Sequence, residues 1–208
     1  MKRPLLIIIV SLLLFVPFLG SVRLFDWDEI NFAENAREMI VTGDYLHMQI
    51  DYRPFYEKPP LFIWLQVLSM KVFGVNEFAA RLPNAVIGVI TLLVVYQIGR
   101  GVRGDRFGLL WAVAYAGSLL PHFYARSGII DPLFNLFIFL GAWSLPRYGG
   151  VVAGLFAGLA VMTKGPVGYG LIVLTTGITW LLLRRTTPLP WRQILTATVV
   201  AAILPAIW

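Results

Sequence analysis

The sequence contains no cysteine, which excludes disulfide bonds, thiolate metal sites and a cysteine nucleophile. Charge is also scarce, since Asp, Glu, Lys and Arg together make up 13% of the 208 residues. An ordinary soluble domain carries about 25% charged residues. Hydrophobic residues make up 58%, and the mean hydropathy is +0.76. This composition predicts an integral membrane protein.

Carboxylates are few and unevenly placed. Of the 11 Asp and Glu residues, nine lie between Arg23 and Arg81, namely Asp26, Asp28, Glu29, Glu34, Glu38, Asp44, Asp51, Glu57 and Glu77. The other two are Asp105 and Asp131. Because the chain gathers its acids in one polar segment between apolar runs, we expect its chemistry to take place there.

The apolar runs predict a series of transmembrane helices. The first follows the basic start of the chain and lacks the small-residue exit of a cleavable signal peptide, so we expect an uncleaved span with a cytoplasmic N-terminus. The predicted spans are residues 5–22, 84–99, 107–125, 132–146, 150–163, 167–183 and 194–208, with 23–83 as a large outward loop. Because the sequence stops inside the last span, we expect 1–208 to be the N-terminal part of a longer transmembrane domain whose C-terminal half is absent.

Two short helices are expected within the outward loop. Residues 28–41 place apolar side chains on one helical face, and Gly43 stands where the helix should stop. Residues 61–73 form an apolar run after two prolines. A span needs about 20 residues, so we expect both helices to lie along the membrane interface. The segment 44–56 between them, rich in turn-forming residues, is predicted to be loop.

The basic residues indicate the orientation. The connections predicted to be cytoplasmic hold nine bases against the single acid Asp105, the bases being Lys2, Arg3, Arg100, Arg103, Arg106, Arg147, Arg184, Arg185 and Arg192. By the positive-inside rule, the acidic loop faces the periplasm or cell exterior. Arg126 and Lys164 fall at outward turns, where orientation does not require them, and are candidates for function. This distribution argues against nucleic acid as a partner.

Asp28 is the first candidate for chemistry. It stands at the start of the predicted helix 28–41, where an acid can serve simply to complement the helix dipole. Asp26 already supplies a cap at the spacing of a capping box with Glu29. Asp28 is therefore a surplus carboxylate at the membrane face, whereas Glu29 is assigned a structural role.

Glu57 and Lys58 form a second candidate, because the two prolines that follow them fix the backbone. Lys58 can neutralise a phosphate as a compact charge, and Glu57 can bind a cation or pair with Lys58. The alternative is a loop ion pair that caps the next helix. Such an exposed pair would contribute little stability.

Asp131 and Lys164 each remain open between two roles. The pair Asp131-Pro132 is a good helix start, so Asp131 can be an N-cap, but at an outward turn it can also take part in chemistry. Lys164 precedes Gly165-Pro166 and can snorkel to the interface or bind a phosphate.

A set of short motifs resembles membrane glycosyltransferases that use polyprenyl-phosphate sugars. The motifs are Asp28-Glu29, Ala36-Arg37-Glu38-Met39, Gly43-Asp44, Tyr56-Glu57-Lys58-Pro59-Pro60-Leu61, Phe73-Gly74 and Ala80-Arg81-Leu82-Pro83. The chain resembles the protein O-mannosyltransferase-like group of the GT-C fold, and within it the bacterial lipid A aminoarabinose transferases, over almost its whole length. The resemblance implies an all-α, polytopic transmembrane protein of GT-C type, with two interfacial helices in the first outward loop.

The resemblance also implies roles for single residues. In that family, acids matching Asp28 and Asp131 are important for catalysis. The residue matching Glu57 helps to hold a divalent metal, here zinc or else magnesium or manganese, and the residue matching Lys58 contacts the donor phosphate. One departure is Asn31-Phe32, which stands where those transferases often carry Arg-Tyr, so lipid A is not assigned as the acceptor.

The sequence therefore predicts a glycosyltransferase that moves a sugar from a polyprenyl phosphate to a lipid or protein acceptor, in the inner (plasma) membrane among its lipids. Asp28 or Asp131 would accept the acceptor's proton. The groups that would offset charge on the phosphate are Lys58, Arg126, Lys164 and a metal at Glu57. One alternative is a transporter or flippase of a lipid-linked anion, which should place charges at mid-span and often shows repeats. Another is a non-catalytic lipid-binding scaffold, in which Asp28 is dispensable.

Overall fold

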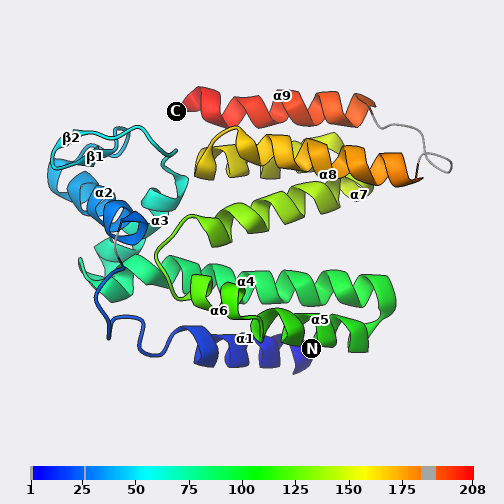
Figure 1. Cartoon of the computed structure of the whole chain (residues 1–208), viewed down its shortest axis with the longest axis horizontal. Helices are drawn as coiled ribbons and strands as arrows, with labels where there is room; N and C mark the ends of the chain where they lie inside the picture. Colours follow the sequence, from blue (N-terminus) through cyan, green and yellow to red (C-terminus); the bar gives the residue numbers. More distant parts are fainter. Residues whose placement is uncertain (1, 26, 184–190) are drawn as a thin grey trace. The chain divides into compact units, whose positions relative to one another are not determined.

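The computed structural model describes residues 2–25, 27–183 and 191–208, and most of these residues are helical (Figure 1). The chain divides into two compact units. Unit 1 comprises Met1–Pro54 and Ile63–Pro132, and unit 2 comprises Phe55–Phe62 and Leu133–Trp208. Two of the bases used to predict the orientation, Arg184 and Arg185, lie outside the described residues.

Unit 1 is organised around its longest helix. Its helices are α1 (Lys2–Phe15), α2 (Asp28–Thr42), most of α3 (Leu61–Phe73), α4 (Glu77–Arg103), α5 (Asp105–Ala116) and α6 (Leu119–Ala125). Helix α4 packs against α1, α5 and α6, as Figure 1 shows. Helices α1, α5 and α6 therefore take their positions from α4.

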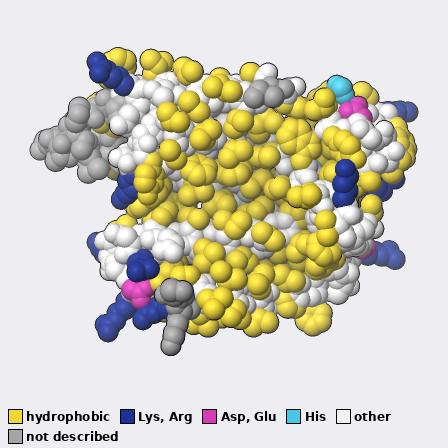
Figure 2. All heavy atoms as spheres, turned by 180° about the vertical axis from the view of Figure 1, so that it is seen from behind, with side chains coloured by type: hydrophobic (Ala, Val, Ile, Leu, Met, Phe, Trp, Pro, Cys, Tyr) yellow, Lys and Arg dark blue, Asp and Glu magenta, His cyan; other side chains and the backbone are white. Residues whose placement is uncertain are grey.

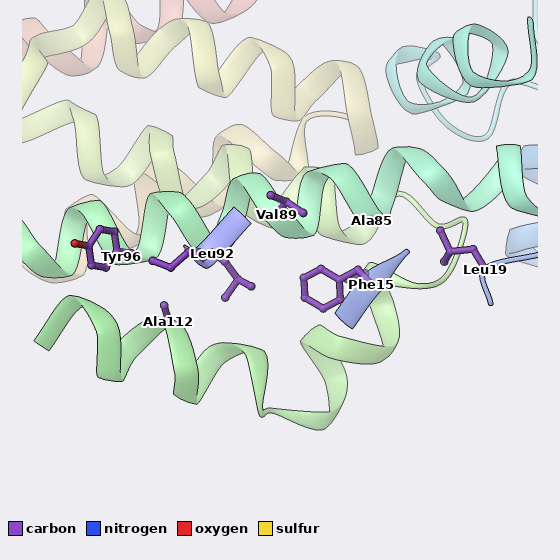
Figure 3. Packing of buried hydrophobic residues seen from close by; sticks show 9 residues of the cluster. Phe15, Leu19, Ala85, Val89, Leu92, Tyr96 and Ala112 are labelled. Carbon is purple, nitrogen blue, oxygen red and sulfur yellow. The ribbon is translucent and has the colours of Figure 1, made fainter. Parts of the chain in front are cut away.

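The apolar core of unit 1 fills the space between α1, α4 and α5. Its central members are Phe15, Leu19, Ala85, Val89, Leu92, Tyr96 and Ala112 (Figure 3). A glycine brings α5 against α4, because a Cβ at Gly108 would lie 2.5 Å from the carbonyl oxygen of Tyr96. At the same end, the Tyr96 hydroxyl donates to Asp105, which also pairs with Arg3.

Unit 2 is a stack of helices packed through small residues. It contains most of α7 (Asp131–Lys164) together with α8 (Val167–Leu183) and α9 (Trp191–Ile207). Helix α7 is interrupted at Gly149, whose φ of 82° and ψ of −178° are not helical, so it consists of two helical halves. Gly150 and Gly154 in the second half lie directly against the backbone of α9. Small residues at such interfaces allow helices in membranes to approach closely.

Two predicted helix ends are wrong, in each case because of a proline. Helix α1 stops at Phe15 instead of residue 22, since Pro17 has no N–H and disfavours helical geometry at the residue before it. Helix α4 begins at Glu77 instead of residue 84, because it accommodates Pro83 within its second turn. Its true start is set by Asn76, whose side-chain oxygen accepts a hydrogen bond from Ala79 N at 2.9 Å.

The range 107–125 was predicted to be one helix. It is instead divided between α5 and α6. The break falls at Gly117 and Ser118. Pro121 explains it, because a proline ring clashes with the carbonyl group four residues earlier in a continuous helix.

The outward loop contains the two predicted helices, α2 and α3, but its middle is not simply loop. Strands β1 (Gln49–Ile50) and β2 (Arg53–Pro54) form a small antiparallel hairpin. The turn residues Asp51 and Tyr52 both have a φ of 58°, and the N–H of Tyr52 donates to the buried carboxylate of Glu38 at 3.0 Å. Turns of this kind favour Asn-Gly or Asp-Gly, so the pair Asp51-Tyr52 is not a recognisable hairpin signal.

Within the described part of the chain, two helices, α4 and the kinked α7, are long and apolar enough to cross a membrane by length and composition. Large apolar side chains are also exposed on shorter helices, such as Leu13 on α1 and Leu182 on α8, and hydrophobic side chains dominate the surface in Figure 2. Extensive apolar exposure of this kind marks surfaces that meet a membrane or a partner. The placement of α2 and α3 along the membrane interface stays a prediction.

Candidate functional site

One buried carboxylate, that of Glu29, anchors the first turn of α2. Its Oε1 accepts hydrogen bonds from Arg81 Nε at 2.8 Å and from the backbone N–H of Gly128 at 2.5 Å. Its Oε2 accepts from Arg81 Nη2 at 2.8 Å and from Phe25 N at 2.6 Å. Glu29 is 1% exposed and Arg81 is 3% exposed. This carboxylate therefore links α2 to α4 and to the loop between α6 and α7.

Arg81 extends the same network to the connection between α1 and α2. Its Nη1 donates to the carbonyl oxygens of Leu19 at 2.7 Å and Val22 at 2.8 Å, and its Nη2 donates to that of Arg23 at 2.9 Å. With the two bonds to Glu29, all five N–H donors of the guanidinium have acceptors. The buried charge is thus fully compensated, which is the condition under which a buried ion pair is tolerated.

Glu29 stays ionised at neutral pH and is therefore unsuited to accept a proton. Its burial opposes ionisation, but the hydrogen bonds from Arg81, Phe25 and Gly128 outweigh that effect. The pKa of the Glu29 carboxyl consequently lies below its ordinary value. Glu29 has the structural role that was predicted for it.

The capping box predicted between Asp26 and Glu29 stays a prediction. The N-cap residue of α2 is Trp27, and it makes no side-chain cap hydrogen bond. Asp26, which was predicted to be the cap, lies outside the described residues. The Glu29 carboxylate is bound instead to Arg81, a residue 52 positions away that no local spacing reveals.

Asp28 differs from its neighbour in being exposed. It is the first residue of α2, so its backbone is held in place by the bonds of the adjacent Glu29. A carboxylate that is accessible on a fixed backbone can receive a proton from a bound substrate. Buried Glu29 has a structural role, whereas the catalytic role of Asp28 stays a prediction.

The loop between α6 and α7 is held by a second set of buried bonds. Asn84 Nδ2 donates to the carbonyl oxygens of Ser127 at 2.5 Å and Ile129 at 2.6 Å. Between those two residues, Gly128 N donates to Glu29. This loop leads directly to Asp131, which is half-buried and begins α7.

Arg126 lies at the start of the same loop. Its Nη1 donates to the carbonyl oxygen of Leu14 at 3.1 Å, and its Nη2 donates to that of Pro17 at 2.7 Å. These carbonyl groups belong to the C-terminal end of α1, where a cation is favourable. Arg126 therefore has a structural role, and its predicted binding of a donor phosphate stays a prediction.

The remaining candidates belong to unit 2. Glu57 is exposed and Lys58 is half-buried, on the segment that leads into α3. Lys164 is half-buried at the end of α7, with its Nζ 5.6 Å from the centroid of the Phe134 ring. Asp28, Arg126 and Asp131, by contrast, belong to unit 1. A common cleft for both sets stays a prediction.

A metal site around Glu57 has no support from the geometry. Among residues 2–25, 27–183 and 191–208, no group of three or more His, Asp or Glu side chains could hold a metal ion. A zinc site normally needs at least three protein ligands. The described side chains alone do not form such a zinc site, the metal at Glu57 stays a prediction, and we assign no step to a metal.

A cleft of about 230 Å³ beside α2 was not anticipated from the sequence. Glu34 and Arg37 stand at its wall, joined by two hydrogen bonds of 2.9 and 2.5 Å. Its apolar lining includes Ile30 and Met70. The spacing of Glu34 and Arg37, three residues apart on a helix, was the available signal for their ion pair.

Comparison with known proteins decides the family. Residues 57–208 match the model of the dolichyl-phosphate-mannose-protein mannosyltransferase family. The chain belongs to this family. The resemblance drawn from the short motifs is thereby confirmed.

Two relatives illustrate how similar known proteins are to this chain. An undecaprenyl phosphate-alpha-4-amino-4-deoxy-L-arabinose arabinosyl transferase from Sodalis glossinidius is 28% identical over 91% of this chain and 36% of its own length. An uncharacterized protein from Aquifex aeolicus is 33% identical over 89% of this chain and 44% of its own length. The chain thus spans less than half the length of these relatives.

The crystal structure of ArnT from Cupriavidus metallidurans bound to undecaprenyl phosphate has the same fold. It matches 98% of this chain and 40% of its own, with a TM-score of 0.83 and 25% sequence identity. The prediction of an all-α, polytopic membrane protein of GT-C type is therefore confirmed.

Proposed function

We propose that the full-length protein is a glycosyltransferase that moves a sugar from a polyprenyl-phosphate donor to a lipid or protein acceptor. The observation that carries this proposal is the fold match over 98% of the chain to a transferase crystallised with undecaprenyl phosphate. The family model and the arabinosyl transferase relatives support the same class of donor.

The chemistry required can be assigned to side chains of this chain. An acceptor hydroxyl or amine attacks the anomeric carbon of the sugar, the bond from that carbon to the phosphate oxygen breaks, and the polyprenyl phosphate leaves. The acceptor's proton passes to a carboxylate, for which exposed Asp28 is the first choice and Asp131 the second. Lys58, Lys164 and Arg126 are the cations proposed to offset the charge that grows on the phosphate.

We place this reaction on the extracytoplasmic face of the inner (plasma) membrane, facing the periplasm or cell exterior. The support is the excess of bases in the connections predicted to be cytoplasmic, set against the acidic segment 23–83. A lipid-linked donor needs a site at the bilayer surface, and short helices such as α2 and α3 suit that position.

The test is Asp28→Asn in the full-length protein, in membrane vesicles supplied with labelled polyprenyl-phosphate sugar and an acceptor fraction. We expect transfer to fall to background while expression stays normal. The matched control is Asp51→Asn, another exposed aspartate of unit 1, at a φ of 58° that asparagine tolerates.

Two outcomes would contradict the proposal. Turnover retained in Asp28→Asn would remove Asp28 from the mechanism. Movement of the labelled donor across the vesicle membrane, without formation of a glycosylated product by the wild-type protein, would favour the transporter or flippase alternative.

A further inference from the structure

The Glu29 carboxylate joins the two segments that carry the candidate proton acceptors. Asp28 precedes it directly on α2, and Asp131 follows Gly128 by three positions in the loop that Glu29 binds. The hydrogen bond from Gly128 N to Glu29 Oε1, at 2.5 Å, is therefore a direct tie between the backbone that holds Asp28 and the backbone that leads to Asp131.

Both partners of this tie, Glu29 and Gly128, are held in place by further hydrogen bonds. On one side, Arg81 holds the Glu29 carboxylate through two hydrogen bonds of 2.8 Å. On the other side, Asn84 holds the carbonyl groups that flank Gly128. Arg81 and Asn84 lie three residues apart on α4, so neighbouring positions of one helix fix both partners of the tie.

We propose that Glu29 is a positioning residue, which sets the separation between Asp28 and the loop leading to Asp131 by binding Gly128 while Arg81 holds it on α4. The inference rests on the proposed transferase function. It assigns Glu29 no contact with substrate. Its effect on the rate comes from geometry, because reacting groups displaced by about 1 Å can lose about a hundredfold in rate.

Gly128 offers a probe that leaves every charge and every hydrogen-bonding group in place. A Cβ added there would lie 3.1 Å from the carbonyl oxygen of Ala80, 3.2 Å from Gln66 Nε2 and 3.3 Å from Glu29 Cγ. These contacts are tighter than ordinary van der Waals distances, so the loop or the Glu29 side chain must shift by a few tenths of an ångström. Gly128→Ala thus changes the spacing without breaking the ion pair.

The matched control is Gly101→Ala. Gly101 also belongs to unit 1, on α4, but a Cβ there would meet no atom within 4 Å. Both variants and Asp28→Asn are made in the full-length protein in membrane vesicles. For each, kcat and the KM for the labelled polyprenyl-phosphate sugar are measured together with the melting temperature.

We expect Gly128→Ala to lower kcat by about tenfold with an unchanged KM and a melting temperature close to that of the wild type. Gly101→Ala should match the wild type in kcat and KM, and its melting temperature should not fall. An unchanged kcat in Gly128→Ala, or a loss that merely follows a lower melting temperature, would overturn the positioning role. Turnover in Asp28→Asn would instead count against the proposed function.

Glu29→Asp supplies a second measurement. It keeps the negative charge beside Arg81 but shortens the side chain by one methylene, so the carboxylate can no longer reach all of its donors. We expect a lower kcat and a pH profile of kcat with the wild-type shape, since Glu29 does not itself exchange a proton. A limb of the profile that shifts in this variant would make Glu29 a general base and overturn the proposal.

Discussion

Each of the two units is stabilised internally by a different kind of contact. In unit 1, buried hydrogen bonds join segments that are far apart in sequence, with Glu29 and Arg81 at the centre. In unit 2, glycines of α7 allow its second half to lie against the backbone of α9. Helix interfaces in membrane proteins use both devices. The difference implies that unit 1 is sensitive to the loss of one polar partner, whereas unit 2 is sensitive to added bulk.

Arg81→Met should have the largest effect on stability. It leaves Glu29 as a buried carboxylate without its cation, and we expect a loss of about 3–5 kcal/mol in the free energy of unfolding. The measurement is denaturant unfolding of the purified protein in detergent. Arg106→Met, at an exposed arginine, is the control and should change stability by less than about 0.5 kcal/mol. If the two variants were equally stable, the ion pair would not be what holds unit 1 together.

Gly150→Ala tests unit 2 by adding one methyl group. Its Cβ would lie 2.2 Å from the carbonyl oxygen of Gln193, so α9 must shift, and overpacking of this kind costs about 1–3 kcal/mol. Gly177→Ala on α8 is the control, because no atom lies within 4 Å of the added group. That control should gain about 0.5–1 kcal/mol from the better helix former. Thermal unfolding of both variants reports the difference, and a neutral Gly150→Ala would show that the contact is loose.

Mild acidification should weaken unit 1 by a smaller amount. Burial raises the pKa of Glu29, but its bonds to Arg81 and two backbone N–H groups lower it further, to below the ordinary value of 4.5. A group of this kind contributes stability that is complete above the pKa of the unfolded state and is lost as the pH falls through the folded pKa. We expect the melting temperature to fall as the pH drops below 4.5.

Glu29→Gln should show less of this pH dependence, although its melting temperature is lower throughout. Comparison of the two proteins over the same acid range isolates the contribution of the Glu29 carboxyl. A wild-type slope in Glu29→Gln would mean that other carboxylates carry the acid sensitivity of unit 1.

Glu34→Gln should have the smallest effect. Arg37 and Glu34 are each 33% exposed, so solvent screens their ion pair, and such pairs contribute about 0.2–1 kcal/mol. The loss should shrink further at high salt. A loss as large as that of Arg81→Met would indicate that the cleft beside α2 depends on this pair.

Proline and glycine residues at helix ends explain what could be predicted from the sequence. Helix α3 occupies the predicted range 61–73, because Pro60 and Gly74 mark its ends. Gly43, with a φ of 74°, follows the last turn of α2 as expected. Pro83 misled the same reasoning, since α4 does not begin after it but starts at Glu77 and contains it. Proline marks the start of a helix reliably only when no capping residue further upstream starts the helix earlier.

Long-range partners explain what could not be predicted. The spacing of Asp26 and Glu29 indicated a capping box, but the partner of Glu29 is Arg81, which was noted only as part of a motif. The structural role of Glu29 was predicted without its actual partner, Arg81, and the catalytic role of Asp28 stays a prediction. A buried charge pair between helices leaves no period in the sequence, because each member looks like one more charged residue in a polar segment.

The interruption of α7 at Gly149 has a consequence for Lys164. Since the chain reverses there, the ammonium group that ends α7 comes to lie 5.6 Å from the ring of Phe134, near the beginning of the same helix. A left-handed backbone costs about 1–2 kcal/mol for residues other than glycine. A side chain at position 149 would therefore separate the two halves of α7. Lys164 would then move away from the ring of Phe134.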